Sequence, residues 1–383
     1  MGTNQESRPR CAGRRVTPMT VSADNHRAPA RLLCDWFRTA QRDLPWRVKA
    51  RSTRRDPYRT LVSEFMLQQT QVSRVLEHFE PFIARFPTVA VLARAREQTV
   101  LGMWSGLGYY RRAKNLHAAA RVIHQEHDGQ VPSDPAALLA LPGVGRYTAG
   151  AIASLAFDQA VPIVDGNISR VLLRLHGRRQ SAADASAWTW DTAAALVRAA
   201  TECNLSAGDL NESLMELGAT VCTPRNPSCG ACPLTRLCAA RKQGSQEDIP
   251  VPGKPTRRTA IYCASVVVTN PRGHILLEQR PSVGLWADMW QTPTLERDDH
   301  PPTPAQLSAY VPGEISTTDT LTSVGTFQHQ TTHRVVHFTV YAARAHTRRP
   351  ADGRVTKSPR ALASIALSNA QRKVIELVGI NLG

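Results

Sequence analysis

Four cysteines lie close together in the chain, at Cys222, Cys229, Cys232 and Cys238. Their spacing is C-x6-C-x2-C-x5-C, and thiolates packed this closely repel one another unless a metal centre offsets their charge. Zinc sites with four cysteines usually use two C-x2-C pairs, whereas this segment has one. The spacing therefore favours an iron–sulfur cluster and leaves zinc open. No flavin, haem or quinone motif accompanies the cysteines, so we expect a structural role.

A glycine hairpin joins two expected short helices in the stretch Leu141-Pro142-Gly143-Val144-Gly145-Arg146-Tyr147-Thr148-Ala149. Glycines let a backbone approach a phosphate closely, and the amides at the start of the second helix then donate to the anion. This arrangement fits a helix-hairpin-helix, which binds the DNA backbone without reading its sequence. The same pattern is also typical of an ordinary helix C-cap followed by a turn.

Two carboxylates, Glu64 and Asp165, are candidates for acid–base chemistry. Asp165 follows Gly145 by 20 residues, at the start of an expected helix. A carboxylate there caps the helix, or, beside a phosphate-binding hairpin, stabilises positive charge on a sugar whose glycosidic bond is breaking. Glu64 lies in a largely apolar helix, where it is either a catalytic acid or a solvated or paired surface residue.

The elements that must position these residues divide the chain into two halves. Apolar periodicity is helical from Ala30 to about Ala240, and it includes one long expected helix from Tyr58 to Phe79. After a polar, proline-containing segment, β-rich runs predict two strand pairs, one of residues 261–269 with 275–279 and one of residues 321–329 with 334–343. A final helix is expected within residues 361–378. The expected fold is a mostly α N-terminal half plus an α+β C-terminal domain.

The 383-residue chain is long enough for two or three domains. We expect a disordered basic tail over residues 1–28 and a helical domain over residues 29–241. A linker over residues 242–257 then leads to an α+β domain over residues 258–383. The sequence has no run of about 18 apolar residues and no secretory signal, so we expect an intracellular protein without a membrane span.

Basic residues outnumber acidic ones by 47 to 31, a net charge of +16, which makes a polyanion the first partner to consider. Residues 1–60 carry 14 Lys or Arg against 5 Asp or Glu. Only six of the cations are lysines, and such an arginine bias can also reflect genome composition. Charge alone leaves DNA, RNA and acidic proteins open as partners.

In this order, the hairpin, Asp165 and the four cysteines resemble the helix-hairpin-helix base-excision DNA glycosylases of the endonuclease III type. Further stretches are similar to the MutY adenine DNA glycosylases within them, namely Ser63-Glu64 with Met66-Leu67-Gln68-Gln69-Thr70, Trp104-Ser105-Gly106-Leu107-Gly108-Tyr109-Tyr110, Asn115-Leu116-His117 and Asn211-Glu212. The resemblance covers about Leu44 to Cys238 and continues into the C-terminal domain. It implies a six-helix barrel over about 58–157, and a cluster subdomain of 29–57 plus 158–241.

The resemblance also implies the activity: an adenine opposite 8-oxoguanine or guanine in double-stranded DNA is flipped out and removed by hydrolysis, which leaves an abasic site. Glu64 is then the general acid toward adenine N7, and Asp165 stabilises the oxocarbenium-like sugar. Tyr147 and Asn167 orient the site. The remaining implied roles are the adenine pocket for Trp46, Arg47 and Glu212, ligation of a [4Fe-4S] cluster for the four cysteines, and DNA contact for Gln69, Leu107, Tyr109, Gly143 and Gly145.

Three stretches of the C-terminal domain, 264–268, 275–281 and 284–290, look like the Nudix-related domain with which MutY proteins recognise 8-oxoguanine. Clustered glutamates of a Nudix hydrolase box are missing, so we expect a lesion-reading module. The family's Phe-Ser-His is replaced by Thr331-Thr332-His333, in which Thr332 keeps a hydroxyl and, with His333, is expected to contact DNA. The basic segment Val48 to Arg55 is additional to the family pattern, and either contacts phosphates or forms a solvated loop.

The residue at position 147, a tyrosine, distinguishes a monofunctional glycosylase from a bifunctional glycosylase/lyase. Bifunctional endonuclease III-like enzymes resemble this chain but carry a Schiff-base lysine at that position, and none of the six lysines here falls in the motif. Without a nucleophilic amine to attack the sugar, we expect a monofunctional, monomeric glycosylase associated with DNA. A bifunctional glycosylase/lyase for oxidised pyrimidines, and a DNA-binding protein without catalysis, are the alternatives.

Overall fold

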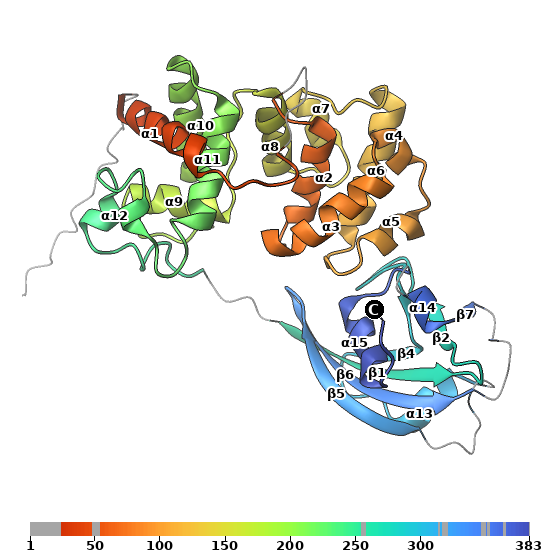
Figure 1. Cartoon of the computed structure of the whole chain (residues 1–383). Coiled ribbons are helices and arrows are strands. Elements are labelled where there is room, and N and C mark those ends of the chain that lie inside the picture. Colours follow the sequence, from red (N-terminus) through yellow and green to blue (C-terminus); the bar gives the residue numbers. More distant parts are fainter. Residues whose placement is uncertain are drawn as a thin grey trace, which may run out of the picture.

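The computed structural model describes residues 24–47, 54–253, 258–312, 315, 321–345, 350, 353–362 and 365–382. It has a helical half, which ends at α12, and a domain built on a β-sheet, as expected from the sequence (Figure 1). The expected tail lies largely outside the described residues. Its last part is different from the prediction, since α1 begins at Asp24 and His26 is already buried.

The helical half consists of short helices joined by tight turns. None of the helices in the described ranges is both long and apolar enough to cross a membrane. The helices are α1 (Asp24–Ala40), α2 (Pro57–Leu67), α3 (Val72–Arg85), α4 (Val89–Ala93), α5 (Glu97–Met103), α6 (Arg111–Glu126), α7 (Pro135–Ala140), α8 (Arg146–Phe157), α9 (Gly166–Leu175), α10 (Ser186–Glu202), α11 (Ala207–Thr220), the 3-10 turn η1 (Cys229–Ala231) and α12 (Ala239–Lys242).

The prediction of one long helix from Tyr58 to Phe79 is wrong, because α2 ends at Leu67 and α3 begins at Val72. Gln69, between them, has a positive φ of 55°. The guanidinium of Arg112 donates hydrogen bonds to the last carbonyls of α2 and of the turn, at 2.6–2.9 Å. A side chain from α6 therefore satisfies the carbonyls that a continued helix would have bonded, and local sequence does not reveal this.

Two hydrophobic cores meet at α8. Helices α2 to α7 share one core with Ala149 and Ile152 of α8, while α1, α9, α10 and α11 share a second core with Ala151 and Leu155. A glycine of α11 lets that helix approach α8 closely, since a Cβ on Gly208 would lie 2.5 Å from the Ser154 carbonyl oxygen. Residues at the ends of α8 are therefore held between the two cores.

The C-terminal domain is a seven-stranded sheet in the order β3-β2-β1-β6-β5, with β4 beside β1 and β7 beside β2. Both expected strand pairs form, β1 with β2 and β5 with β6, each antiparallel, while β1 and β6 are parallel. The elements are β1 (Thr259–Thr269), β2 (Ile275–Gln279), β3 (Trp290–Gln291), β4 (Thr294–Arg297), α13 (Pro304–Tyr310), β5 (Thr322–Gln330), β6 (Arg334–Arg344), β7 (Arg354–Lys357), α14 (Pro359–Leu362) and α15 (Asn369–Leu377).

Alternate residues of β1 face opposite sides of this sheet. Cys263 and Val267 pack with residues of α15, while Val266 and Val268 pack with residues of α13. Because successive side chains of a strand point to opposite faces, both faces of β1 are buried under a helix.

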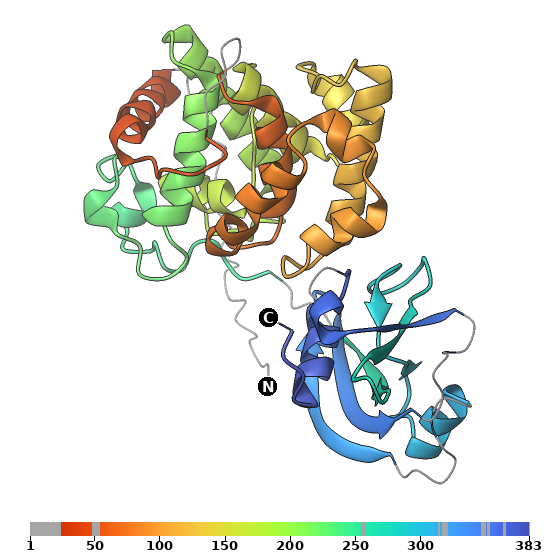
Figure 2. The same cartoon turned by 45° about the vertical axis from the view of Figure 1, so that its right-hand side comes forward.

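The C-terminal domain lies below the helical half in the view of Figure 2, and side-chain contacts join the two. Met289 of the C-terminal domain is part of the core of the first helices. The Tyr110 hydroxyl donates to the Leu367 carbonyl at 2.9 Å, Lys114 pairs with Asp288, and further hydrogen bonds flank them. The loop from α5 to α6, which carries the motif Trp104 to Tyr110, is therefore held against the C-terminal domain.

Candidate active site and cluster site

The candidate acid Glu64 is buried within α2. Asp56 caps this helix by accepting from two backbone amides, and Pro57 occupies its first turn. Glu64 is 4% exposed. Burial, followed by the negative charges of Asp165 and Glu212, raises the pKa of Glu64 from 4.5 to about 8, against the hydrogen bond from Tyr147. Glu64 therefore carries a proton at neutral pH, as a general acid requires.

Asp165 both caps a helix and faces Glu64. Its Oδ1 accepts from the backbone amide of Ile168, at 2.7 Å, at the start of α9. Its Oδ2 accepts from the Asn167 side-chain amide at 3.0 Å. The cap expected from the sequence is therefore present, and it holds the carboxylate where its charge acts on Glu64.

Tyr147, in the first turn of α8, completes this group. Burial of its hydroxyl, followed by the charges of Glu64 and Asp165, raises its pKa well above the ordinary value. The hydroxyl donates to the Met215 sulfur at 3.9 Å, and its hydrogen bond with Glu64 lowers the pKa of that carboxyl.

These residues line a cavity of about 170 Å³ between α2, α8, α9 and α11. Its lining includes every residue that the resemblance assigned to catalysis or to the adenine pocket, and no lysine is among the described residues that line it. This volume is below the roughly 300–1,000 Å³ that is typical of sites for drug-sized ligands. The assigned residues in the lining are Glu64, Asp165, Tyr147, Asn167, Trp46, Arg47 and Glu212.

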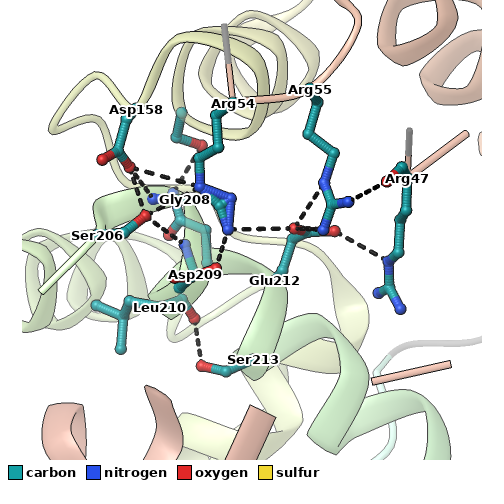
Figure 3. Close-up of polar contacts among 12 residues, drawn as sticks. Arg47, Arg54, Arg55, Asp158, Ser206, Gly208, Asp209, Leu210, Glu212 and Ser213 are labelled. Carbon is teal, nitrogen blue, oxygen red and sulfur yellow. Dashed lines mark hydrogen bonds and ion pairs between the residues drawn. The ribbon is translucent and has the colours of Figure 1, made fainter. Parts of the chain in front are cut away.

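Two carboxylates of α11 form one wall of the cavity. Glu212 pairs with Arg47 at 3.0 Å and with Arg55 at 2.5 Å (Figure 3). Glu216, one turn later, pairs with Arg42 at 2.6 Å and with Arg47 at 2.8 Å. Burial alone would raise the pKa of Glu216, but the hydrogen bonds and charges of Arg42 and Arg47 outweigh it, so the pKa lies below the ordinary value.

Sequence reasoning missed Arg42, Arg55 and Glu216. The i, i+4 spacing of Glu212 and Glu216 on one face of an apolar helix was the available signal. The basic segment that ends at Arg55 was expected to contact phosphates or to be a solvated loop. Residues 48–53 lie outside the described residues, but Arg54 and Arg55 turn inward to carboxylates, and so fit neither expectation.

The structure exposes most of the residues expected to contact DNA. Gln69 and Tyr109 are exposed at the tips of two turns, with positive φ angles of 55° and 48°. Arg112 holds both turns, because its guanidinium also donates to the Leu107 and Gly108 carbonyls at 3.2 and 3.0 Å. Leu107 itself is buried, at 5% exposed.

The expected reader of the partner strand lies next to one of these turns. The Tyr109 hydroxyl is 3.1 Å from the Thr332 hydroxyl of the C-terminal domain. Thr332 and His333 are both exposed in the turn between β5 and β6. The two halves thus present one continuous set of exposed side chains.

The hairpin between α7 and α8 has the geometry expected of a backbone-binding turn. Gly143 has φ +74°, and a Cβ there would collide with the Asn115 side chain. Gly145 precedes α8, is exposed, and has no atom within 4 Å of the position of a Cβ. The free amides at the start of α8 therefore lie open to an anion.

The four cysteines surround a small cavity of about 30 Å³ after α11. The described residues contain no group of three or more ligating side chains gathered for a single metal ion. Four thiols that line one shared cavity are suited to holding a metal centre. Arg174, buried, lies 3.4 Å from the Cys222 sulfur and adds positive charge beside the thiolates.

Three segments of the chain match models of protein families. Residues 62–189 match the HhH-GPD superfamily of base excision DNA repair proteins. Residues 222–238, which begin and end on the first and last of the four cysteines, match the iron–sulfur binding domain of endonuclease III. Residues 264–377 match a NUDIX domain. These matches confirm the expected fold classes of both halves and an iron–sulfur centre in place of zinc.

Two similar proteins are adenine DNA glycosylases. The adenine DNA glycosylase of Mycobacterium tuberculosis is 42% identical over 285 residues, which cover 73% of this chain and 88% of that protein. The adenine DNA glycosylase of Rattus norvegicus is 38% identical over 313 residues, 69% of this chain and 60% of that protein. Among solved structures, a thermostable thymine-DNA glycosylase is 29% identical, with a TM-score of 0.49, over 58% of this chain and all of that chain.

The extent of these matches differs between relatives. The chain aligns with 60% of the length of the rat protein and 56% of the human one, but with most of the bacterial protein. On the identity and coverage of the M. tuberculosis relative, this chain belongs to the adenine DNA glycosylase family.

Proposed function

We propose that the protein, as a monomer, removes adenine paired with 8-oxoguanine or guanine in duplex DNA and leaves an abasic site. The observation that carries the proposal is the pair Glu64 and Asp165 in one cavity, with the pKa of Glu64 raised to about 8. A protonated acid and a carboxylate in the same pocket are the arrangement that glycosidic hydrolysis uses.

The proposed steps follow from these positions. A flipped adenine enters the cavity, and protonated Glu64 gives its proton to N7 of the base. The glycosidic bond breaks, its electron pair leaves with the base, and the Asp165 carboxylate stabilises the positive charge on the sugar. Water then adds to the sugar, and the proton it loses restores Glu64. Tyr147 and Asn167 hold the two carboxyl groups through the hydrogen bonds described above.

The absence of a lysine from the described cavity lining supports a monofunctional enzyme. Tyr147 is a neutral phenol with a raised pKa and is therefore a poor nucleophile toward the sugar. The four cysteines, Cys222, Cys229, Cys232 and Cys238, are proposed to ligate the [4Fe-4S] cluster, which holds their loop in place when bound.

Recognition of the strand opposite the adenine is assigned to the adjacent turns. Gln69 and Tyr109 enter the duplex, while Thr332 and His333 contact the partner base from the C-terminal domain. The 3.1 Å contact between the Tyr109 and Thr332 hydroxyls supports this assignment, because it places both groups at one point.

A strand-cleavage assay tests the proposal. Purified protein is incubated with an end-labelled duplex that holds adenine opposite 8-oxoguanine, and half of each sample is treated with alkali. Breaks that appear only after alkali are the expected result. No adenine release would refute the proposal, and breaks without alkali, with a borohydride-trapped adduct, would favour a bifunctional glycosylase/lyase instead.

A further inference from the structure

Arginines surround the Glu212 carboxylate, and they contact its two oxygens differently. Oε2 accepts from Arg55 twice, from Nε at 3.1 Å and from Nη2 at 2.5 Å. Nη2 of Arg54 lies 3.6 Å from the same oxygen. Oε1 accepts once, from Nε of Arg47 at 3.0 Å. Since each carboxylate oxygen accepts about two hydrogen bonds, Oε2 is saturated and Oε1 has one acceptor position left.

The segment before α2 is anchored so that Arg55 keeps this geometry. Arg54 donates its backbone amide to the Ala156 carbonyl at 2.9 Å, donates from Nε to Ser206 at 3.0 Å, and pairs with Asp209 (Figure 3). Arg55 also donates to the Arg47 carbonyl at 2.5 Å. The two guanidinium groups of this segment thus have separate roles: Arg54 anchors it to α8 and α11, and Arg55 contacts the cavity wall.

Glu212 is buried and lines the cavity, so a ligand in the cavity is a partner for the open position on Oε1. The Glu212 side chain is 5% exposed and that of Arg55 is 8% exposed. Glu212 lines the cavity with Glu64, and its charge is felt at Glu64. A carboxylate can only accept, so the group it selects must be a hydrogen-bond donor, such as the exocyclic amino group of a purine.

We propose that Arg55 is a positioning residue that makes the pocket selective for an exocyclic amino group: it occupies Oε2 of Glu212 and so presents Oε1 to that amino group. This inference rests on the proposed adenine excision and extends it to a residue of the basic segment. Without Arg55, Oε2 loses both of its hydrogen bonds and only Arg47 still donates to the carboxylate, so the open position on Oε1 is held less firmly toward the base.

The test compares two substrates that differ in that amino group alone. Single-turnover excision rates are measured on duplexes with adenine or with unsubstituted purine opposite 8-oxoguanine, for the wild type, R55M and R55K. We expect R55M to lower the adenine rate about 10- to 100-fold, the effect of one hydrogen bond to a charged group, and to change the purine rate by less than about threefold. R55K, which keeps one point charge, should fall between the wild type and R55M.

R179M is the control, because Arg179 is also paired with a carboxylate, Asp248 at 2.6 Å, but is not part of the cavity lining. Its two rates should change together, with their ratio within about twofold of the wild-type ratio. Cluster absorbance and circular dichroism show whether each variant folds, and R55K carries the test if R55M does not fold.

Parallel losses on both substrates in the Arg55 variants, or no change in the ratio, would overturn the inference and leave adenine excision intact. A wild-type protein that releases no adenine would instead refute the proposed function.

Discussion

Replacement of Glu64 by Gln should make the stability of the helical half less dependent on pH. The pKa of Glu64 rises from 4.5 in the unfolded chain to about 8 in the folded protein, chiefly through burial and then through the charges of Asp165 and Glu212. Between these values the folded state holds a proton that the unfolded state has released. Stability is therefore greatest below about pH 4.5 and falls as pH rises through 8.

The magnitude follows from the size of the shift. One pKa unit corresponds to about 1.4 kcal/mol, so Glu64 lowers the unfolding free energy by about 1.4 kcal/mol per pH unit across this window, and by about 5 kcal/mol in total. In Glu64→Gln the side chain does not ionise, and this slope disappears. The variant should gain stability relative to the wild type as pH rises, with a plateau above about pH 8.

Urea unfolding followed by the helical circular dichroism signal, between about pH 5 and about pH 9, measures the difference. Glu126→Gln, on the exposed face of α6, is the matched control and should follow the wild-type curve. A difference between wild type and Glu64→Gln that is constant with pH would refute the assignment of a buried, protonated carboxyl. The same variant should lose about 10²- to 10⁴-fold in adenine release and retain DNA binding.

Three further changes separate the roles of other residues. Asp165→Asn keeps the cap of α9, so unfolding should change by less than about 1 kcal/mol while excision falls about 10²- to 10³-fold; a fall in both would show a mainly structural residue. Arg112→Met leaves several buried carbonyls without a donor, so thermal unfolding should shift downward and DNA footprinting should lose the contacts near the two exposed turns; unchanged footprints would contradict the role of Arg112. Cys232→Ser should lose the broad visible absorbance and acid-labile sulfide, whereas stoichiometric zinc in the wild type would overturn the cluster assignment.

The sequence alone determined those features that depend on residues near one another in the chain. The cysteine spacing, the hairpin at Gly143 and Gly145, and Asp165 at the start of a helix each carry their signal within about twenty residues. Short β-rich runs likewise predicted the strand pairs of the C-terminal domain. Local backbone preference and local ligand spacing are enough for such features.

Only the tertiary structure decided the features that join distant segments. The break between α2 and α3 depends on Arg112, which lies more than 40 residues further along the chain. The pairing of Arg55 with Glu212 joins residues 157 positions apart. The protonation of Glu64 depends on burial and on charges from α9 and α11. These are effects of packing and of low-dielectric electrostatics, which exist only once the two cores have closed around the cavity.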